Sequence, residues 1–486
     1  MEKICFELKN IELSFLDKEV LRIENLAIHQ FDRIGIVGKN GAGKTTLMKL
    51  LTGQIEPEKG QVLKAVEFGH FKQMETPEKL DSEYDYSLLG KLNIPQNMNY
   101  LSGGEESRLK LVQLFSQYHE ALLLDEPTTH LDSEGTSFVI DELRYYYGAL
   151  IIISHDRKLL DELVTSIWEV QDAQVSVYTG NYSDYEKQKE SEWNQQLQAR
   201  EQFQKEKSRL ERAAQDKMKK AEKITQSGRM SKKESKSKAN RMFESKSKGT
   251  GQKSVHRAAK AIEQRIEQLE EVDPLRIEKS IIFPKQETLE LHNSFPVMAN
   301  QLTIKVEEKI LLDEASFQFP RGKKIAILGP NGSGKSTLLK LIARRDEALT
   351  ISPKAKIGYF QQTSYRFTGD DTLIEYVKKH SDFDEGFLRS VLHTMDFTGT
   401  DIQKKLTSLS GGEAIRLQLC LLFLGAFNIL LLDEPTNFLD LHAIKALETF
   451  IKSYDGTILL VSHDEVFVQN VVDLRYKIDK KKLTVL

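Results

Sequence analysis

The stretch that decides the fold is GKNGAGKT, from Gly38 to Thr45, which follows the apolar run RIGIV and precedes TLMKLL. Its spacing, Gly38-x-x-x-x-Gly43-Lys44-Thr45, is that of a complete P-loop. In such a loop backbone N–H groups wrap a phosphate, the lysine reaches the β- and γ-phosphates, and the hydroxyl ligates Mg²⁺. An apolar strand before it and a helix after it are the context this chemistry needs. The stretch therefore predicts a phosphate-binding α/β domain with a parallel sheet.

The same motifs occur twice along the chain, in the same order. The repeated pairs are GKNGAGKT with GPNGSGKS (Gly329–Ser336), LSGGE (Leu101–Glu105 and Leu409–Glu413), LLLDEPTTHLD (Leu122–Asp132) with LLLDEPTNFLD (Leu430–Asp440), and ISHD (Ile153–Asp156) with VSHD (Val461–Asp464). The serine of LSGGE precedes the glutamate of DEP by 24 residues in both copies, and that glutamate precedes the histidine by 29 in both. Because order and spacing agree, we interpret the chain as a tandem duplication.

A segment of different composition separates the two copies. Residues Asn181–Ser227 contain neither Pro nor Gly and predict one long, solvated helix. A second helix is expected over Val255–Val272, ending before Pro274. The expected seam of the first helix is Phe203, Leu210, Ala214, Met218 and Ala221. The fold class is thus α/β, with two P-loop NTPase domains in tandem (1–182 and 293–486) joined by an α-helical hairpin linker (183–292) whose tip lies near 228–252.

The charge of the chain is unevenly distributed. Arg212–Lys260 holds sixteen Lys and Arg against four Asp and Glu, a balance of +12, so the rest of the chain carries −15 of the total −3. Such a basic segment between two acidic bodies favours a polyanionic partner that docks on the middle of the chain.

Composition excludes several classes of protein. The only cysteines, Cys5 and Cys420, exclude a disulfide framework. The longest apolar stretch, Leu419–Leu432, has 14 residues, short of the roughly 18 that span a bilayer. The N-terminal MEKICFEL has no apolar signal region. We expect a cytoplasmic protein without a transmembrane segment of its own.

Together the P-loop, LSGGE, LLLDEP and SHD motifs resemble those of ATP-binding-cassette (ABC) ATPases, over both halves. The resemblance implies an ATPase that hydrolyses ATP to ADP and phosphate at two composite sites, with Mg²⁺. Glu126 and Glu434 would orient or deprotonate the attacking water, and His155 and His463 would reach the γ-phosphate. In a lone strand, a terminal Asp-Glu pair would more often be a solvated cap.

The resemblance also implies the binding residues, which divide between the halves. Nucleotide contacts are expected from Phe15, Gly38, Asn40, Gly41, Gly43, Lys44, Thr45, Thr46, Gln73, Ser102, Gly103 and Gly104, and from Gly329, Asn331, Gly332, Gly334, Lys335, Ser336, Thr337, Gln362, Ser410, Gly411 and Gly412. Metal contacts are expected from Thr45, Gln73, Asp125, Ser336, Gln362 and Asp433. In that family the halves face head to tail, so site one pairs Lys44 with Ser410, and site two pairs Lys335 with Ser102.

Two cassettes on one chain, no membrane span and a charged helical linker resemble the F subfamily (ABC-F), whose members bind ribosomes. GNYSDY (Gly180–Tyr185), the Ser/Lys-rich tip and DEPTNFLD are similar to its antibiotic-resistance branch, the Msr/Mel-type ribosomal protection proteins. The resemblance implies a monomer that binds the bacterial 70S ribosome. Its linker would enter the exit-tRNA (E) site near 23S rRNA and P-site tRNA. Its tip residues Arg241, Met242 and Phe243 would lie near the bound macrolide or streptogramin B.

Two other functions remain open on these residues. One is a housekeeping ABC-F translation factor, and the other is the ATPase subunit of a drug exporter with a separate membrane partner. The sequence also departs from the usual family pattern. Thr129 stands where Asn is usual and Phe438 where His is usual. Phe15 would stack on adenine, but its counterpart in the second half is Val306, which indicates unequal sites.

Overall fold

The structure is a computed structural model of the chain. It describes residues 3–15, 18–72, 103–129, 131–227, 257, 260–262, 264, 283–284, 290–307, 309–361 and 367–486. Its long-range contacts divide the chain into two compact units, Met1–Tyr185 with Glu278–Leu486, and Glu186–Ile277. The domain bounds expected from the sequence stay a prediction.

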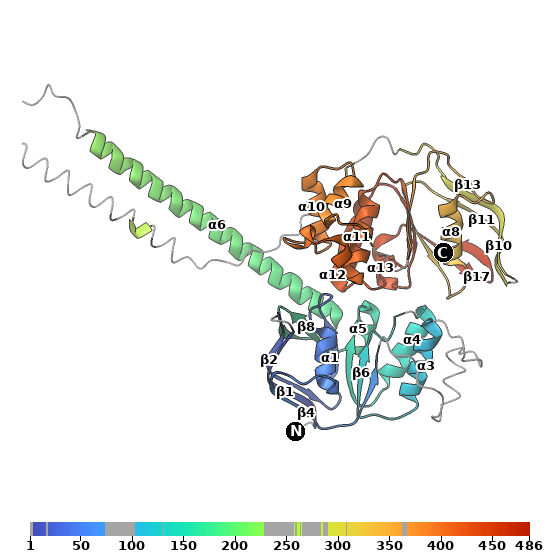
Figure 1. The fold of residues 1–486 in the computed structure, drawn as a ribbon, viewed down its shortest axis with the longest axis horizontal. Coiled ribbons are helices and arrows are strands. Elements are labelled where there is room, and N and C mark those ends of the chain that lie inside the picture. The colour runs from blue at the N-terminus through green and yellow to red at the C-terminus, as the bar shows by residue number, and fades with distance from the viewer. Residues whose placement is uncertain are drawn as a thin grey trace, which may run out of the picture. The chain divides into compact units, whose positions relative to one another are not determined.

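A six-stranded sheet forms the centre of the first half, with the order β5-β6-β7-β3-β8-β9. Figure 1 labels β6 and β8 of this sheet. The neighbours from β5 to β8 run parallel, and β9 returns antiparallel to β8. The strands and helices of this half are β1 (Ile4–Phe15), β2 (Lys18–His29), β3 (Arg33–Val37), α1 (Lys44–Thr52), β4 (Lys59–Lys64), β5 (Phe68–Phe71), α3 (Gly103–Phe115), β6 (Ala121–Asp125), α4 (Ser133–Arg144), β7 (Ala149–Ile153), α5 (Arg157–Leu163), β8 (Ser166–Gln171) and β9 (Gln174–Thr179).

Both faces of this sheet are buried, which explains the unbroken apolar runs that the sequence shows there. Successive residues of β6 alternate between two cores: Leu123 packs with Ile151 on one face, and Leu122 and Leu124 pack with Ile152 on the other. Every residue of β6 and β7 is buried. Only the residues at the carboxyl ends of these strands are left to serve a binding site.

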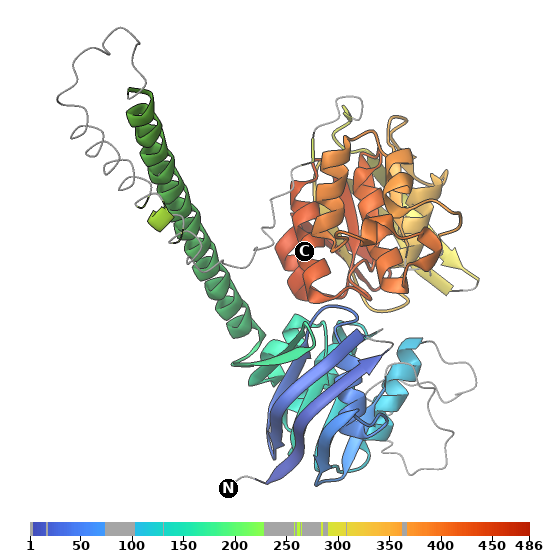
Figure 2. The ribbon, with the colours of Figure 1, turned by 60° about the vertical axis from the view of Figure 1, so that its left-hand side comes forward.

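A smaller antiparallel sheet, β2-β1-β4, packs on the first of these cores. Figure 2 shows β1 and β2 as two long paired strands, and their register places Leu13 opposite Leu21. Strand β1 ends at Phe15, so this sheet brings an aromatic side chain to the side of the P-loop.

The second half repeats this architecture, with a six-stranded sheet β14-β15-β16-β12-β17-β18 and a small sheet β11-β10-β13. Its elements are β10 (Val297–Val306), β11 (Lys309–Phe319), β12 (Lys324–Leu328), α8 (Lys335–Arg344), β13 (Thr350–Ile351), β14 (Ile357–Phe360), α9 (Leu373–Lys379), α10 (Glu385–Thr394), η2 (Asp401–Gln403), η3 (Leu406–Ser408), α11 (Gly411–Leu424), β15 (Ile429–Asp433), α12 (Leu441–Ser453), β16 (Thr457–Val461), α13 (Glu465–Val471), β17 (Leu474–Asp479) and β18 (Lys482–Val485). The predicted pair of P-loop domains in tandem is confirmed.

One long helix, α6 (Tyr182–Ser227), follows the first half, as predicted for Asn181–Ser227. Its 46 residues correspond to about 69 Å at the α-helical rise. Of the predicted seam, Leu210 and Ala214 are buried, whereas Met218 is 38% exposed. The side chain of Ala221 lies outside the described residues.

The rest of the predicted hairpin is described only at a few positions. Arg257, residues 260–262 and Gln264 are helical, in agreement with the helix expected over Val255–Val272. The tip, including Arg241, Met242 and Phe243, lies outside the described residues. None of the helices in the described part combines the length and the apolar character that a bilayer crossing needs.

Candidate functional site

Both P-loops connect a buried strand to a helix, as the sequence predicts. Gly38 follows β3 with a φ of 147°, and a Cβ there would lie 2.4 Å from the carbonyl oxygen of Val170. Gly43 precedes α1 with a φ of 109°, and the matching Gly334 precedes α8 with a φ of 103°. These left-handed conformations favour glycine, so the loop geometry explains the motif.

The two P-loop lysines are held in the same way. Lys44 Nζ donates to the carbonyl oxygens of Gly38, at 2.6 Å, and Lys39, at 3.1 Å. Lys335 Nζ makes the equivalent bonds of 2.7 and 3.0 Å within its own loop. Both side chains are buried, and burial lowers the pKa of each ammonium. The loops thus hold buried cations where a phosphate would approach.

The acid that ends each central strand lies beside the hydroxyl that follows the P-loop lysine. Ser336 Oγ donates to Asp433 Oδ1 at 2.8 Å, and the Tyr359 hydroxyl donates to Oδ2 at 3.3 Å. Burial raises the pKa of Asp125, and a hydrogen bond with the Thr45 side chain opposes this shift. A hydroxyl beside one carboxylate suits Mg²⁺, which takes oxygen ligands and shares them with substrate phosphates. No cluster of three or more His, Cys, Asp or Glu side chains forms a metal cage among the described residues.

The glutamates that follow these acids have strained backbones. Glu126 has a φ of 52° and Glu434 a φ of 50°, conformations that non-glycine residues rarely adopt. Each is anchored by its N–H, which donates at 2.9 Å to the last residue of the neighbouring strand, Ile153 or Val461. Strain of this kind is found where a side chain must be held in one direction.

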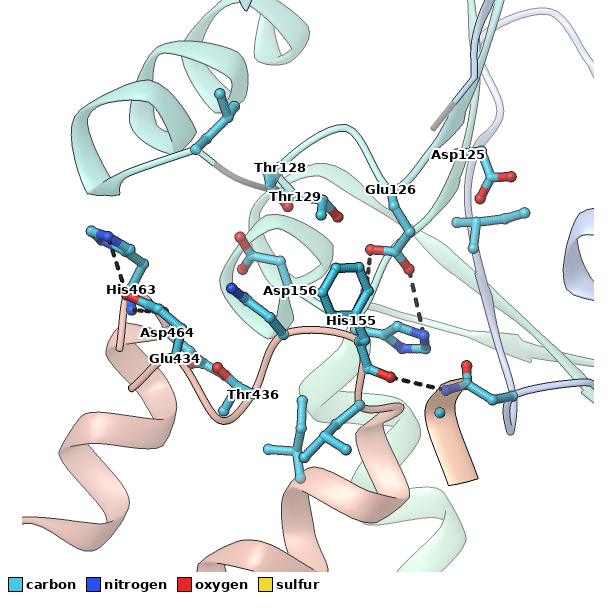
Figure 3. A pocket seen from close by; sticks show the side chains of 18 of the residues that line it. Asp125, Glu126, Thr128, Thr129, His155, Asp156, Glu434, Thr436, His463 and Asp464 are labelled. Carbon is cyan, nitrogen blue, oxygen red and sulfur yellow. Dashed lines mark hydrogen bonds and ion pairs between the residues drawn. The ribbon is translucent and has the colours of Figure 1, made fainter. Parts of the chain in front are cut away.

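That direction is toward the histidine of the SHD motif (Figure 3). Glu126 Oε1 lies 3.5 Å from His155 Nε2, and Glu434 Oε1 lies 3.3 Å from His463 Nε2. The other oxygen of each glutamate faces the N–H of the same histidine at 3.4 and 3.3 Å. Oε1 of both glutamates is buried without a hydrogen-bond donor among the described residues. A bound water or phosphate group would supply that missing partner.

Burial dominates the acid–base properties of these pairs. It raises the pKa of Glu126 to about 8 and that of Glu434 to about 7, although the nearby P-loop lysine opposes the shift in each half. Burial and the same lysines lower the pKa of His155 to about 3 and that of His463 to about 4. The imidazoles are therefore neutral near pH 7, and the glutamates titrate in the range useful to a general base.

These shifts predict that ATP turnover rises with pH well above the usual range of a carboxylate at both sites. A glutamate accepts a proton only when it is ionised, so kcat/KM for ATP should rise with pH through the pKa of the free enzyme. With Glu434→Gln only Glu126 remains, and we expect the rise near pH 8; with Glu126→Gln we expect it near pH 7. Steady-state measurement of kcat/KM for each variant at saturating Mg²⁺, over about four pH units from roughly pH 5.5 to 9.5, checks this expectation. A common rise below pH 6 in both variants would contradict it.

A cavity of about 1150 Å³ brings residues of both halves together. The predicted residues that line it are Phe15, Asn40, Gly41, Gly43, Lys44, Thr45, Thr46, Asp125, Glu126, His155, Asn331, Gly332, Gly334, Lys335, Ser336, Thr337, Ser410, Gly412, Glu434 and His463. Gly38, Gly329, Gly411 and Asp433 lie beside it in the P-loops, in α11 and at the end of β15. Gly103 and Gly104 open α3, and Gln73, Ser102 and Gln362 lie outside the described residues.

Ser410 caps α11 at the edge of this cavity. Its hydroxyl accepts from the N–H of Glu413 at 3.3 Å, and the Glu413 carboxylate accepts from the N–H of Ser410 at 2.8 Å. This capping box leaves the positive end of the helix facing the cavity, where it suits an anion. A Cβ on Gly412 would lie 3.6 Å from Asn40 Nδ2 of the other half.

Two aspartates that sequence reasoning did not assign join the halves. Asp440 caps α12 through Oδ1, which accepts from Ala443 N–H at 2.9 Å, and its Oδ2 accepts from Asn40 N–H at 2.8 Å. Asp132 caps α4 and likewise accepts from Asn331 N–H at 3.3 Å. Both aspartates end the repeated stretches LLLDEPTTHLD and LLLDEPTNFLD, so their repetition was the signal that could have identified them.

The two halves of the cavity differ in their walls. Phe15 lines it, while Val306, its counterpart by repeat spacing, does not. Val20 and Leu311, which the same repeat spacing relates, both line it, so the two walls differ at the aromatic position alone among these counterparts. The Phe438 carbonyl accepts from Asn40 Nδ2 at 3.2 Å, so this departure from the usual histidine still contacts the opposite P-loop through its backbone.

Comparison with known proteins identifies the family. A family model described as "ABC transporter" matches residues 21–81 and 312–437. The chain is 39% identical to the erythromycin resistance ATP-binding protein MsrA of Staphylococcus epidermidis, over 98% of both chains. It is 32% identical to the ribosome protection protein VmlR of Bacillus subtilis (strain 168), over 96% of this chain and 85% of that protein.

Solved structures show the same fold. The RNase-L inhibitor superposes with a TM-score of 0.64 at 17% identity, over 98% of this chain and 90% of that chain. The ABC domains bind ATP and imply its hydrolysis. The chain therefore belongs to the F subfamily of ATP-binding-cassette proteins, with tandem ABC domains, and is related to the erythromycin resistance ATP-binding protein MsrA and to the ribosome protection protein VmlR.

Proposed function

We propose that this protein is a ribosome-binding ATPase that confers antibiotic resistance by ribosomal protection. The observation that carries the proposal is the 39% identity to MsrA over 98% of both chains, together with the relation to a ribosome protection protein. The name of MsrA refers to erythromycin, a macrolide, and this supports macrolides as antibiotics affected. Streptogramin B is proposed from the resemblance of the sequence to the Msr/Mel-type branch.

ATP would bind at two composite sites in this proposal. In site one, Lys44 contacts the β- and γ-phosphates, and the N-terminus of α11 at Ser410 approaches the γ-phosphate from the other half. Thr45 and Asp125, with Gln73, would hold Mg²⁺, which neutralises charge on the phosphates. In site two Lys335, Ser336, Asp433 and Gln362 take these roles, opposite the helix that begins after Ser102.

Hydrolysis would then separate the halves. The unpaired Oε1 of Glu126 or Glu434 orients a water for in-line attack on the γ-phosphate, and accepts its proton. The neutral imidazole of His155 or His463 donates toward the γ-phosphate. While that phosphate is present it bridges a P-loop to the opposite Ser410 or Ser102 helix; once it leaves, the bridge is lost.

The basic linker would contact the ribosome while the halves are closed. Its surplus of positive charge, +12 over Arg212–Lys260, suits ribosomal RNA, whose phosphates dominate such binding. The linker would occupy the exit-tRNA site near 23S rRNA and P-site tRNA. Its tip at Arg241, Met242 and Phe243 would displace the drug from the peptidyl-transferase centre and exit tunnel.

Antibiotic susceptibility tests the proposal directly. A susceptible bacterium that expresses the chain should become resistant to macrolides and streptogramin B, in a panel that includes lincosamides and pleuromutilins. Deletion of Ser231–Ser247 should abolish this resistance but leave basal ATP turnover within about threefold, because the P-loops and LSGGE motifs stay intact. Resistance that survives the deletion would contradict a role of the tip, and no resistance to any class would contradict the proposal.

Ribosome binding should also weaken steeply with salt. Each phosphate contact releases counterions, so six to ten contacts would lower the affinity roughly 10³- to 10⁵-fold between about 50 and 200 mM salt. Cosedimentation with 70S ribosomes in ATP, over a series of KCl concentrations, measures the slope. A variant with four linker lysines changed to Gln (Lys232, Lys233, Lys236 and Lys238) should show a shallower slope. A slope that is flat, or equal for both proteins, would refute an electrostatic role for the linker.

A further inference from the structure

A buried ion pair joins the two halves away from the P-loops. Arg157, the first residue of α5, donates through Nη1 to Glu448 Oε1 on α12 at 2.7 Å. Their side chains are only 5% and 11% exposed. Asn470 on α13 donates to the same oxygen at 3.2 Å. Arg157 Nε and Nη2 have no hydrogen-bond partner among the described residues. Within that part of the chain, the guanidinium therefore depends on its bond to Glu448.

The elements that this pair connects both begin at site one. α5 starts directly after His155 and Asp156, and Asp156 caps it by accepting from Leu159 N–H at 3.1 Å. α12 starts directly after Asp440, whose Oδ2 holds the N–H of Asn40 in the opposite P-loop. Arg157 thus ties the turn that carries His155 to the helix whose cap contacts the P-loop of the same site.

Site two has no equivalent of this pair. The SHD and LLLDEP motifs of the two halves are offset by 308 residues, from His155 to His463 and from Asp132 to Asp440. The same offset relates Arg157 to Glu465 and relates Glu448 to Ile140. A glutamate and a buried isoleucine cannot form an ion pair, so the asymmetry follows from the sequence as well as from the geometry.

The interface around Arg157 is complementary in other ways. Glu465 contacts Lys158 at 3.0 Å, and Leu441, the first residue of α12, packs into the apolar core of the first half with Leu160 and Tyr182. The carboxyl of Asp464 is close enough for Arg157 to affect it: burial raises the pKa of Asp464 to about 6, and Arg157 opposes this shift. Arg157 therefore faces two acids of the second half, Glu448 and Asp464.

We propose that Arg157 is a positioning residue for site one: its buried contact with Glu448 holds the His155 turn against the opposite half and keeps nucleotide enclosed at this site more firmly than at site two. The inference rests on the proposed roles of the ATP sites. Breaking a buried ion pair by removal of one partner leaves the other charge unpaired, which is costly. Removal of the guanidinium should therefore loosen site one more than site two, because the pair adjoins site two only through Asp464 and Asn470 of the second half.

Release of a fluorescent ATP analogue tests this in the full chain with Glu126→Gln and Glu434→Gln, in which hydrolysis is blocked. In the parent protein, chase with unlabelled ATP should release both bound nucleotides slowly, and the nucleotide at site one more slowly than the one at site two. Adding Arg157→Met should release one of the two at least about tenfold faster, because unpairing Glu448 raises the dissociation rate. Arg157→Lys should recover part of the slow release, and so should the charge exchange Arg157→Glu with Glu448→Arg.

Matched variants separate this role from general damage to the fold. Lys158→Met removes the neighbouring pair, whose side chains are 34% and 48% exposed, and should change release by less than about twofold. If Arg157→Met accelerated the release of both nucleotides equally, the variant would have lost structure generally. If release were unchanged, the ion pair would not affect nucleotide retention. Either result overturns the inference. A parent protein that fails to retain nucleotide at all would instead refute the proposed ATP sites.

Discussion

Exchange of Glu126 and Glu434 for Gln in one protein should lower ATP turnover at least about 100-fold and leave ATP binding intact. Each glutamate keeps one buried carboxylate oxygen without a hydrogen-bond partner among the described residues, beside a neutral histidine. Glutamine has nearly the same shape but no basic oxygen, so water can still bind while its proton has no acceptor. The strained φ of 52° and 50° should persist, because the backbone N–H bonds to Ile153 and Val461 hold it.

Two assays measure this expectation together. Phosphate release gives the turnover, and equilibrium binding of a fluorescent ATP analogue gives the affinity, which should stay within about threefold of the parent. Cosedimentation in ATP should show the variant retained on 70S ribosomes, because the bridging phosphate is not removed. A protein with Glu134→Gln and Glu347→Gln, both exposed positions, is the matched control and should behave as the parent. Turnover within tenfold of the parent would rule out the two glutamates as the general bases.

Much of the site could be predicted from the sequence because its parts are local. A P-loop needs only eight consecutive residues, from Gly38 to Thr45, and its glycines are required by backbone conformations within that loop. The helix over Asn181–Ser227 was predicted for a similar reason, since the absence of Pro and Gly acts residue by residue. Predictions of this kind depend on short-range geometry alone.

The contacts between the halves could not be predicted in this way. Arg157 and Glu448 are 291 residues apart, and Asn40 and Asp440 are 400 apart, so only the folded pairing of two domains brings them together. Comparison of the two repeats also misses the Arg157–Glu448 pair. Motif matching finds residues that the two halves share, and the halves differ at both of these positions. Asp132 and Asp440, by contrast, lie within the repeated motif. Their contact with the P-loop of the other half uses the second carboxylate oxygen, and motif spacing does not predict that contact.

Replacing both P-loop lysines, with Lys44→Met and Lys335→Met, should remove about half or more of the stabilisation of the protein by ATP without destabilising the nucleotide-free form. In that form each ammonium is buried, its hydrogen-bond acceptors among the described residues are carbonyl oxygens alone, and burial lowers its pKa, which disfavours the charge. A methionine of similar length removes this cost, and the loss of two carbonyl contacts offsets the gain. The free energy of unfolding without ATP should therefore change by less than about 1 kcal/mol.

With ATP the two proteins should diverge. At 100 times Kd, one bound ligand adds about 2.7 kcal/mol to the stability of the parent, and the loss of a charge-assisted phosphate contact of about 1.5 to 3 kcal/mol weakens binding roughly 10- to 150-fold. Thermal unfolding with and without ATP and Mg²⁺ measures both effects in one experiment. Lys49→Met with Lys340→Met, on the same helices but outside the cavity, is the control and should retain the ATP-induced rise in Tm. If the P-loop variant kept that rise, or if it unfolded at a much lower temperature without ATP, the buried lysines would be structural cations and not the phosphate contacts proposed here.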